Sequence, residues 1–219
     1  MAPGTAYHPR EDSHVHGSWL SIFLFLASGK ASRFGSNKLL YPLWGKPLFS
    51  WGLEALREAA GKEPDCTLRV VSQYEAIRHW AEDQCILAVD SPLSHLGLSH
   101  TIRAGLESIK NLSPEDTLVF AAADQPFLRA DTIRRLLSAP GPTARIYWQD
   151  TPGNPASFSA SLAPELMALE GDRGGGVLLK KYPCTKVTAA SCWELWDIDR
   201  LEALEALPPE FITQYEKKN

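Results

Sequence analysis

Residues 22–38 read Ile22-Phe23-Leu24-Phe25-Leu26-Ala27-Ser28-Gly29-Lys30-Ala31-Ser32-Arg33-Phe34-Gly35-Ser36-Asn37-Lys38. The first five residues are all apolar and do not alternate, which is typical of a short strand buried on both faces of a largely parallel sheet. The rest is rich in small residues and contains two glycines. Because glycine permits positive φ and a close approach to the backbone, such a loop can direct several N–H groups at one anion. The segment therefore predicts a central strand followed by a phosphate-binding loop.

Cations strengthen this interpretation. Arg33 and Lys38 follow the loop's first glycine, and together they would complete a receptor for a polyphosphate. An ordinary strand-to-helix turn with solvated cations explains the same composition, so both hypotheses stay open here. The loop lacks the Gly-Lys-Ser/Thr ending of a Walker A loop and the Gly-x-Gly-x-x-Gly of a dinucleotide fold. Two common phosphate-binding families are therefore disfavoured.

Composition excludes several other classes. A formal charge of −4 over 219 residues, without a basic run, argues against nucleic acid as a partner. No apolar run approaches the roughly 18 residues that span a membrane, so no membrane partner is expected. The four cysteines lack Cys-x-x-Cys spacing, which predicts neither a zinc site nor disulfides. We expect buried free thiols and a cytoplasmic location.

The chain is expected to form one α/β domain over residues 18–219 after a disordered tail, Met1–Gly17. Strands are predicted at 22–26, 67–72, 85–89, 117–123 and 144–148, with an extended stretch from 153 to 159. Helices are predicted at 47–60, 75–84, from 99, 131–138 and 164–169. Near the end, 194–199 is strand-like and 200–207 and 209–217 are helical. The alternation predicts a Rossmann-like, mostly parallel central sheet with helices on both faces.

Carboxylates fall at expected strand ends. Asp124 directly follows the apolar strand 117–123, and open α/β sheets bind ligands at the carboxyl ends of their strands. A turn-initiating aspartate before Pro126 is the alternative interpretation. If 194–199 is extended, Asp197 and Asp199 point to the same side, where two like charges repel unless a cation lies between them.

The loop and its continuation resemble a known signature. Leu-Ala-Ala-Gly-x-Ser-x-Arg-Met-Gly-x-x-Lys marks the nucleotidyltransferases that activate sugars, isoprenoid precursors and molybdopterin, and the matching residues are Leu26, Ala27, Gly29, Arg33, Gly35 and Lys38. The departures are Ser28, Ala31 and Phe34. Ala123-Asp124-Gln125-Pro126 and Gly153-Asn154-Pro155 are similar to motifs of the molybdopterin branch. The resemblance runs in the family's order from about residue 22 to about residue 207, and it implies the nucleotide-diphospho-sugar transferase-like fold.

The resemblance also implies roles for individual residues. The implied nucleotide-binding residues are Leu26, Ala27, Ser28, Gly29, Arg33, Gly35, Lys38 and Thr101, although capping by Ser99 would by itself explain the helix start around Thr101. The implied catalytic residues are Arg33, Lys38 and Asp124. The implied Mg²⁺ ligands are Asp124, Asp199 and, as the weaker candidate, Asp197. The implied acceptor-binding residues are Asn154, Asp172 and Arg173. Gly176 stands where the family pattern has arginine, and Arg173 or Lys180 is a candidate substitute for that cation.

The activity implied by the resemblance is transfer of a nucleoside monophosphate from CTP to a phosphorylated acceptor, molybdopterin, with release of pyrophosphate. The attacking phosphate oxygen is already ionised at neutral pH, so no general base is expected. Two alternatives remain open. One is a guanylyltransferase acting on molybdopterin or another phosphorylated acceptor. The other is a non-catalytic chaperone that binds the finished cofactor and delivers it to a molybdenum hydroxylase.

Overall fold

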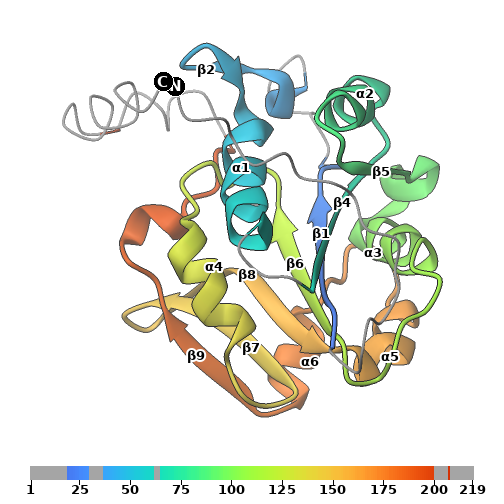
Figure 1. Cartoon of the computed structure of the whole chain (residues 1–219), viewed down its shortest axis with the longest axis vertical. Helices are drawn as coiled ribbons and strands as arrows, with labels where there is room; N and C mark the ends of the chain where they lie inside the picture. The colour runs from blue at the N-terminus through green and yellow to red at the C-terminus, as the bar shows by residue number, and fades with distance from the viewer. Residues whose placement is uncertain (1–18, 30–36, 62–64, 200–206, 208–219) are drawn as a thin grey trace.

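A seven-stranded sheet with the order β5-β4-β1-β6-β8-β7-β9 forms the centre of the computed structural model (Figure 1). The structure describes residues 19–29, 37–61, 65–199 and 207. The strands are β1 (Ser21–Leu26), β4 (Cys66–Ser72), β5 (Leu87–Asp90), β6 (Thr117–Ala122), β7 (Thr143–Trp148), β8 (Thr151–Ser159) and β9 (Cys184–Thr188). The first four run parallel to one another, β8 runs antiparallel to β6 and β7, and β9 is parallel to β7. The prediction of a mostly parallel sheet is confirmed.

Helices cover both faces of this sheet (Figure 1). They are α1 (Leu48–Gly61), α2 (Glu75–Asp83), α3 (Leu98–Glu107), α4 (Ala130–Leu137), α5 (Ala163–Met167) and α6 (Gly176–Lys181). Short 3-10 turns lie between them: η1 (Lys38–Leu40), η2 (Pro92–Leu96), η3 (Ala160–Leu162) and η4 (Cys192–Leu195). A two-stranded ribbon, β2 (Pro42–Leu43) with β3 (Lys46–Pro47), precedes α1.

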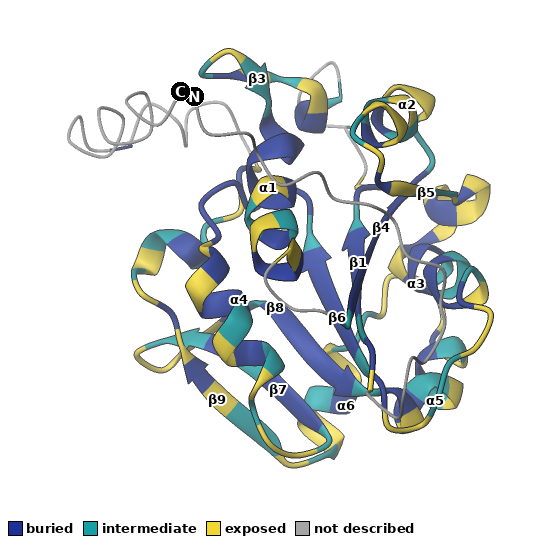
Figure 2. Cartoon of the chain, in the orientation of Figure 1, coloured by how far each residue is buried: buried dark blue, intermediate teal, exposed yellow. Residues whose placement is uncertain are grey.

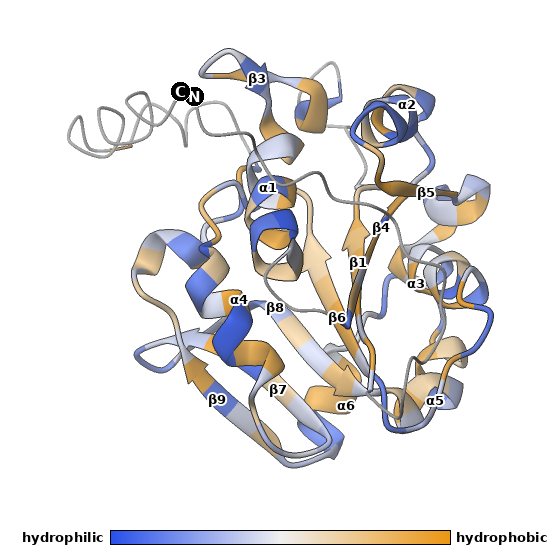
Figure 3. Ribbon diagram, in the orientation of Figure 1, coloured by the Kyte–Doolittle hydropathy of each residue, from blue (hydrophilic) through white to orange (hydrophobic). Residues whose placement is uncertain are grey.

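Strand β1 separates two hydrophobic cores. Phe23 and Phe25 point into the core shared with α1 and α4, while Ile22 and Leu24 point into the core shared with α3 and α5. All four side chains are fully buried, and Figure 2 shows β1 and β6 buried except at their ends. Figure 3 shows β1, β4 and β6 as a hydrophobic layer. The unbroken apolar run is therefore explained by burial of both strand faces.

The chain changes direction across the sheet between β1 and β6. After β1 it continues to β4 and β5 on one side, and it then returns to β6 on the other side of β1. Such a switch point leaves a crevice beyond the carboxyl ends of the two strands, because their following segments leave in opposite directions. Two described polar residues that follow these strands, Ser28 after β1 and Asp124 after β6, line this crevice.

Some local predictions were wrong. Residues 194–199 do not form a strand: η4 ends at Leu195, and an irregular segment follows. The buried Glu194 accepts backbone hydrogen bonds there, which favours a turn over a ladder. The sequence interpretation also missed β9 and the β2–β3 ribbon, and it started the third strand too early, since Cys85 has φ 58° and lies before β5.

The cysteine prediction needs correction. Cys66 is buried, but Cys85 and Cys192 are exposed, and all four described cysteines are free. The predicted tail Met1–Gly17 and the predicted helices over 200–207 and 209–217 lie outside the described residues, apart from Leu207. Within the described ranges, none of the helices has the length and hydropathy required to cross a bilayer.

Candidate functional site

A cavity of about 510 Å³ lies at the switch point between β1 and β6. Its walls come from the end of β1, the end of β6, the start of α3, strand β8 and the segment 172–176. Most of the predicted site residues that the structure describes line it: Leu26, Ser28, Gly29, Lys38, Thr101, Asp124, Asn154 and Asp172. Folding thus gathers residues from distant parts of the chain around one cavity.

Lys38 lies between two carboxylates. Its Nζ donates to Asp124 Oδ2 at 2.9 Å and to Asp199 Oδ1 at 2.8 Å. The lysine belongs to η1, whose start is capped by the Asn37 side chain accepting from Leu39 N. Burial lowers the pKa of Lys38, but the charges and hydrogen bonds of Asp124 and Asp199 outweigh it and raise the pKa above its ordinary value. The lysine is therefore a permanent cation.

A backbone contact brings the C-terminal carboxylates to this cation. Ile198 N donates to Asp124 O at 2.9 Å, which docks the segment 197–199 against the end of β6. Burial and the charges of Asp124 and Asp199 raise the pKa of Asp197 to about 6, although the residue as a whole is exposed. The predicted strand is absent, yet its two carboxylates lie beside Asp124.

The carboxylates at the site suit a hard divalent cation that takes some of its ligands from the protein and the others from water and a substrate. Asp124 and Asp199 already converge on one positive charge, the Lys38 ammonium. Across the described residues, no group of three His, Cys, Asp or Glu side chains forms a complete metal cage. Mg²⁺ commonly takes only one or two protein carboxylates and completes its shell with water and substrate phosphates. Two converging carboxylates therefore fit such an ion, and a cage is not required.

The end of β1 is held by the end of β4 and the two residues that follow it. Ser72 Oγ donates to Ala27 O at 2.7 Å, Gln73 Nε2 to Ser28 O at 2.9 Å, and Tyr74 OH to Gly29 O at 2.9 Å. Three successive carbonyl groups are thereby occupied. None of the described residues accepts a hydrogen bond from the N–H groups of Ser28 or Gly29. The sequence interpretation missed these three side chains because their role depends on contacts across about 45 residues.

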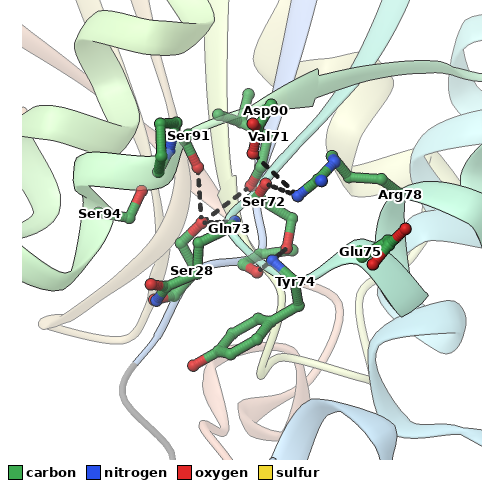
Figure 4. Close-up of polar contacts among 12 residues, drawn as sticks. Ser28, Val71, Ser72, Gln73, Tyr74, Glu75, Arg78, Asp90, Ser91 and Ser94 are labelled. Atoms are coloured by element: carbon green, nitrogen blue, oxygen red, sulfur yellow. Dashed lines mark hydrogen bonds and ion pairs between the residues drawn. The ribbon is translucent and has the colours of Figure 1, made fainter.

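Two hydroxyl groups are already used within the protein. Ser28 Oγ accepts from Gln73 N at 3.0 Å and lies 3.0 Å from Ser91 Oγ (Figure 4). Thr101 Oγ1 donates to Ser94 Oγ at 2.7 Å, and both residues line the cavity. Ser94 was not identified from the sequence. These bonds leave the Ser28 and Thr101 side chains as supports of the cavity wall.

The remaining predicted residues divide into two groups. Arg33 and Gly35 lie outside the described residues. Ala27 is buried, whereas Arg173, Asp197 and Asp199 are exposed, and none of the four lines the cavity. Arg145 on β7 lines it but was missed. A single charged residue within the apolar strand Ala144-Arg145-Ile146 was the available signal.

This fold and site define an α/β protein with a cation–carboxylate cluster at the sheet's switch point. Residues 23–187 match the family model described as "MobA-like NTP transferase domain". The chain therefore belongs to the MobA-like NTP transferase family, which confirms the predicted family and makes it a member of the nucleotidyltransferases.

Two curated relatives show how far the similarity extends. The chain is 29% identical over 194 residues to the purine catabolism protein PucB of Bacillus subtilis, covering 83% of this chain and 92% of PucB. It is 32% identical over 117 residues to the bifunctional protein GlmU of Pelobacter propionicus, covering 52% of this chain. That match spans only 25% of GlmU.

Three solved structures share the fold. A nucleotidyl transferase from Methanothermobacter has a TM-score of 0.71 at 19% identity, covering 93% of this chain and 100% of that one. Mycobacterium tuberculosis Rv0371c in complex with manganese has a TM-score of 0.65 at 20% identity, covering 85% and 96%. Molybdopterin-guanine dinucleotide biosynthesis protein A from Archaeoglobus fulgidus has a TM-score of 0.60 at 18% identity, covering 90% and 97%.

Proposed function

We propose that this protein transfers a cytidylyl group from CTP to the phosphate of molybdopterin and releases pyrophosphate. The observation that carries the proposal is the contact of Lys38 with Asp124 and Asp199. Lys38 and Asp124 line the cavity at the switch point. A cation and two carboxylates at one point suit a triphosphate and its counter-ion. Membership of the MobA-like family supports the same reaction class.

The reaction joins two anions, so charge neutralisation and alignment supply most of the catalysis. An acceptor phosphate oxygen forms a bond to the α-phosphorus, the bond from that phosphorus to the bridging oxygen breaks, and pyrophosphate leaves with the electron pair. The attacking oxygen carries no proton to remove. Lys38 binds phosphate oxygens, and Arg33 and the N–H groups of the loop that ends at Gly35 are proposed to do the same.

A divalent metal is part of the proposal. Asp124 and Asp199 would hold Mg²⁺, with Asp197 beside them, and the ion would neutralise phosphate charge when bound. The manganese complex of a fold neighbour supports a divalent ion in this fold. Lys38 would then contact the substrate phosphate as well as the carboxylates of Asp124 and Asp199.

The end of β1 favours cytosine. Its carbonyl groups already accept from Ser72, Gln73 and Tyr74, whereas the N–H groups of Ser28 and Gly29 donate to none of the described residues and are proposed to donate to a base. Cytosine presents two adjacent acceptors, O2 and N3, on its pairing edge, whereas guanine presents one acceptor beside two donors. A site that offers donors leaves them partly unpaired with guanine, at about 1–3 kcal/mol per group.

Guanylyl transfer is the second candidate, because a fold neighbour is named molybdopterin-guanine dinucleotide biosynthesis protein A.

We place the reaction in the cytoplasm, where the exposed thiols of Cys85 and Cys192 would stay reduced. The proposed recipient of the product is a molybdenum hydroxylase.

Pyrophosphate release with each triphosphate in turn, with and without molybdopterin and Mg²⁺, tests the proposal. We expect release only with all components and a CTP preference over GTP of about tenfold to several hundredfold in kcat/KM. Equal use of CTP and GTP would contradict the cytidylyl assignment. Tight binding of molybdopterin without pyrophosphate release from any triphosphate would identify a chaperone.

A further inference from the structure

Arg145 lines the cavity and lies beside an irregularity in the sheet. The antiparallel pairing of β7 with β8 shifts register between Arg145 and Tyr147. Such bulges redirect side chains and are common next to functional sites. Arg145 Nε donates to Gly153 O at 2.5 Å, which fixes the plane of the guanidinium group. The side chain is half-buried and lines the cavity together with Asn154 and Asp172.

Arg145 differs from Lys38, the other described cation that lines the cavity, in having no carboxylate partner among the described residues. Of the described residues that line it, Lys38 and Arg145 are positive and Asp124 and Asp172 are negative. Lys38 is held by two carboxylates. No described carboxylate forms an ion pair with Arg145, and no described group accepts from its two Nη atoms. Four N–H donors of a permanent cation thus remain for a ligand.

The neighbouring wall lacks side chains. At Gly174 a Cβ would lie 2.7 Å from Leu98 Cδ2, and at Gly175 it would lie 2.5 Å from Phe158 Cζ, so a side chain at either position would force its neighbour to move. At Gly176 a Cβ would meet nothing within 4 Å. These residues line the same cavity as Arg145. Three consecutive glycines therefore leave this part of the cavity wall without side chains.

We infer that Arg145 determines acceptor specificity by binding the terminal phosphate of the acceptor through Nη1 and Nη2. The inference rests on the proposed function and adds the residue that recognises the acceptor's phosphate. Two parallel N–H···O bonds suit a phosphate, whose third oxygen stays available for attack on the α-phosphorus. Arg145 transfers no proton. The nucleotide is held elsewhere, by Lys38 and the end of β1.

Steady-state kinetics with CTP, Mg²⁺ and varied molybdopterin test this role. Arg145→Gln is expected to raise the KM for molybdopterin by about tenfold to a hundredfold and to leave the KM for CTP within about twofold. Arg145→Lys keeps the charge but not the paired donors, so it should recover part of the loss. Lys186→Gln is the matched control, because Lys186 is the register partner of Arg145 on β9 and does not line the cavity.

If Arg145 only supported the fold, Arg145→Gln would raise the KM for CTP and the KM for molybdopterin together. Arg145→Lys would then recover neither value. Unchanged molybdopterin KM in Arg145→Gln overturns the inference while leaving nucleotidyl transfer intact. If the unaltered protein releases no pyrophosphate, the proposed function fails, and calorimetry with inorganic phosphate then decides about Arg145. At least tenfold weaker phosphate binding by Arg145→Gln, with Lys186→Gln unchanged, supports the anion site. Equal binding by all variants overturns it.

Discussion

Lys38 is a nearly buried cation that pairs with two carboxylates at the site. Its ammonium group is nearly enclosed, with a side chain 10% exposed, and it compensates two carboxylates at once. Removing it leaves Asp124 and Asp199 as neighbouring negative charges at the proposed triphosphate site. Lys46 provides the contrast: it pairs with Glu54, lies 3.6 Å from the Trp51 ring centroid and does not line the cavity.

Lys38→Ala is therefore expected to lower kcat/KM by about two to three orders of magnitude, because a charge-assisted phosphate contact is lost and two repulsive charges are exposed to the substrate. Lys46→Ala should change kcat/KM by less than about threefold. Pyrophosphate release at saturating and limiting CTP measures both. A larger loss in Lys46→Ala would show that the phosphate site has been misplaced.

Asp124 provides a test of the metal assignment. Asp124→Asn keeps the shape of the side chain but removes its charge, so we expect several kcal/mol less transition-state stabilisation. Binding of Mn²⁺ in the presence of CTP, followed by electron paramagnetic resonance, should weaken in parallel. Thermal unfolding is the control, and the midpoint should change little because the carboxylate lies at a strand end and its side chain is 25% exposed. Full activity in this variant would rule out Asp124 as a ligand.

At the scale of elements, Glu194 joins η4 to the start of α4. Its carboxylate accepts from Arg129 N at 3.2 Å, Thr132 Oγ1 at 3.1 Å and Ala190 N at 2.6 Å. Burial raises the pKa of Glu194 above its ordinary value, and these hydrogen bonds only partly oppose it. The buried carboxylate therefore fixes the C-terminal segment that carries Asp197 and Asp199.

The raised pKa predicts how stability depends on pH. The native state holds this proton more tightly than the unfolded state, so the contribution is fully present below pH 4.5 and is lost as pH rises through the raised folded value. Glu194→Gln cannot titrate. It should lower the free energy of unfolding by about 1–3 kcal/mol through a lost acceptor. It should also remove this part of the pH dependence, as measured by urea unfolding at several pH values. An unchanged pH profile would contradict the assignment.

At the scale of the whole molecule, the cavity depends on contacts between segments far apart in the chain. Gly97, between η2 and α3, has φ +140°, and a Cβ there would lie 2.3 Å from the backbone of Gly171. Ser99 N also donates to Gly171 O at 3.1 Å. This junction joins the α3 wall to the wall formed by residues 172–176.

Gly97→Ala should separate these two walls, because neither the backbone conformation nor the contact tolerates a methyl group. We expect a loss of about 1–3 kcal/mol and a midpoint lower by about 2–4 °C per kcal/mol, measured calorimetrically. Gly61→Ala is the matched control, since a Cβ there meets nothing within 4 Å and should be neutral or slightly stabilising. An unchanged unfolding midpoint in Gly97→Ala would show that the junction between Gly97 and Gly171 can accommodate a methyl group at little cost.

The sequence by itself determined the central strand, the alternation of strands and helices, and the position of Asp124 at a strand end. These features are local: apolar runs, periodicity and turn residues report burial along a few consecutive residues. The placement of Lys38 against Asp124 and Asp199 was decided only by tertiary structure, since 86 and 161 residues separate the partners. The antiparallel β8, the register shift beside Arg145 and the side chains that cap the end of β1 were decided in the same way. Strand pairing and side-chain contacts depend on how distant segments share two cores, and no local pattern encodes that packing.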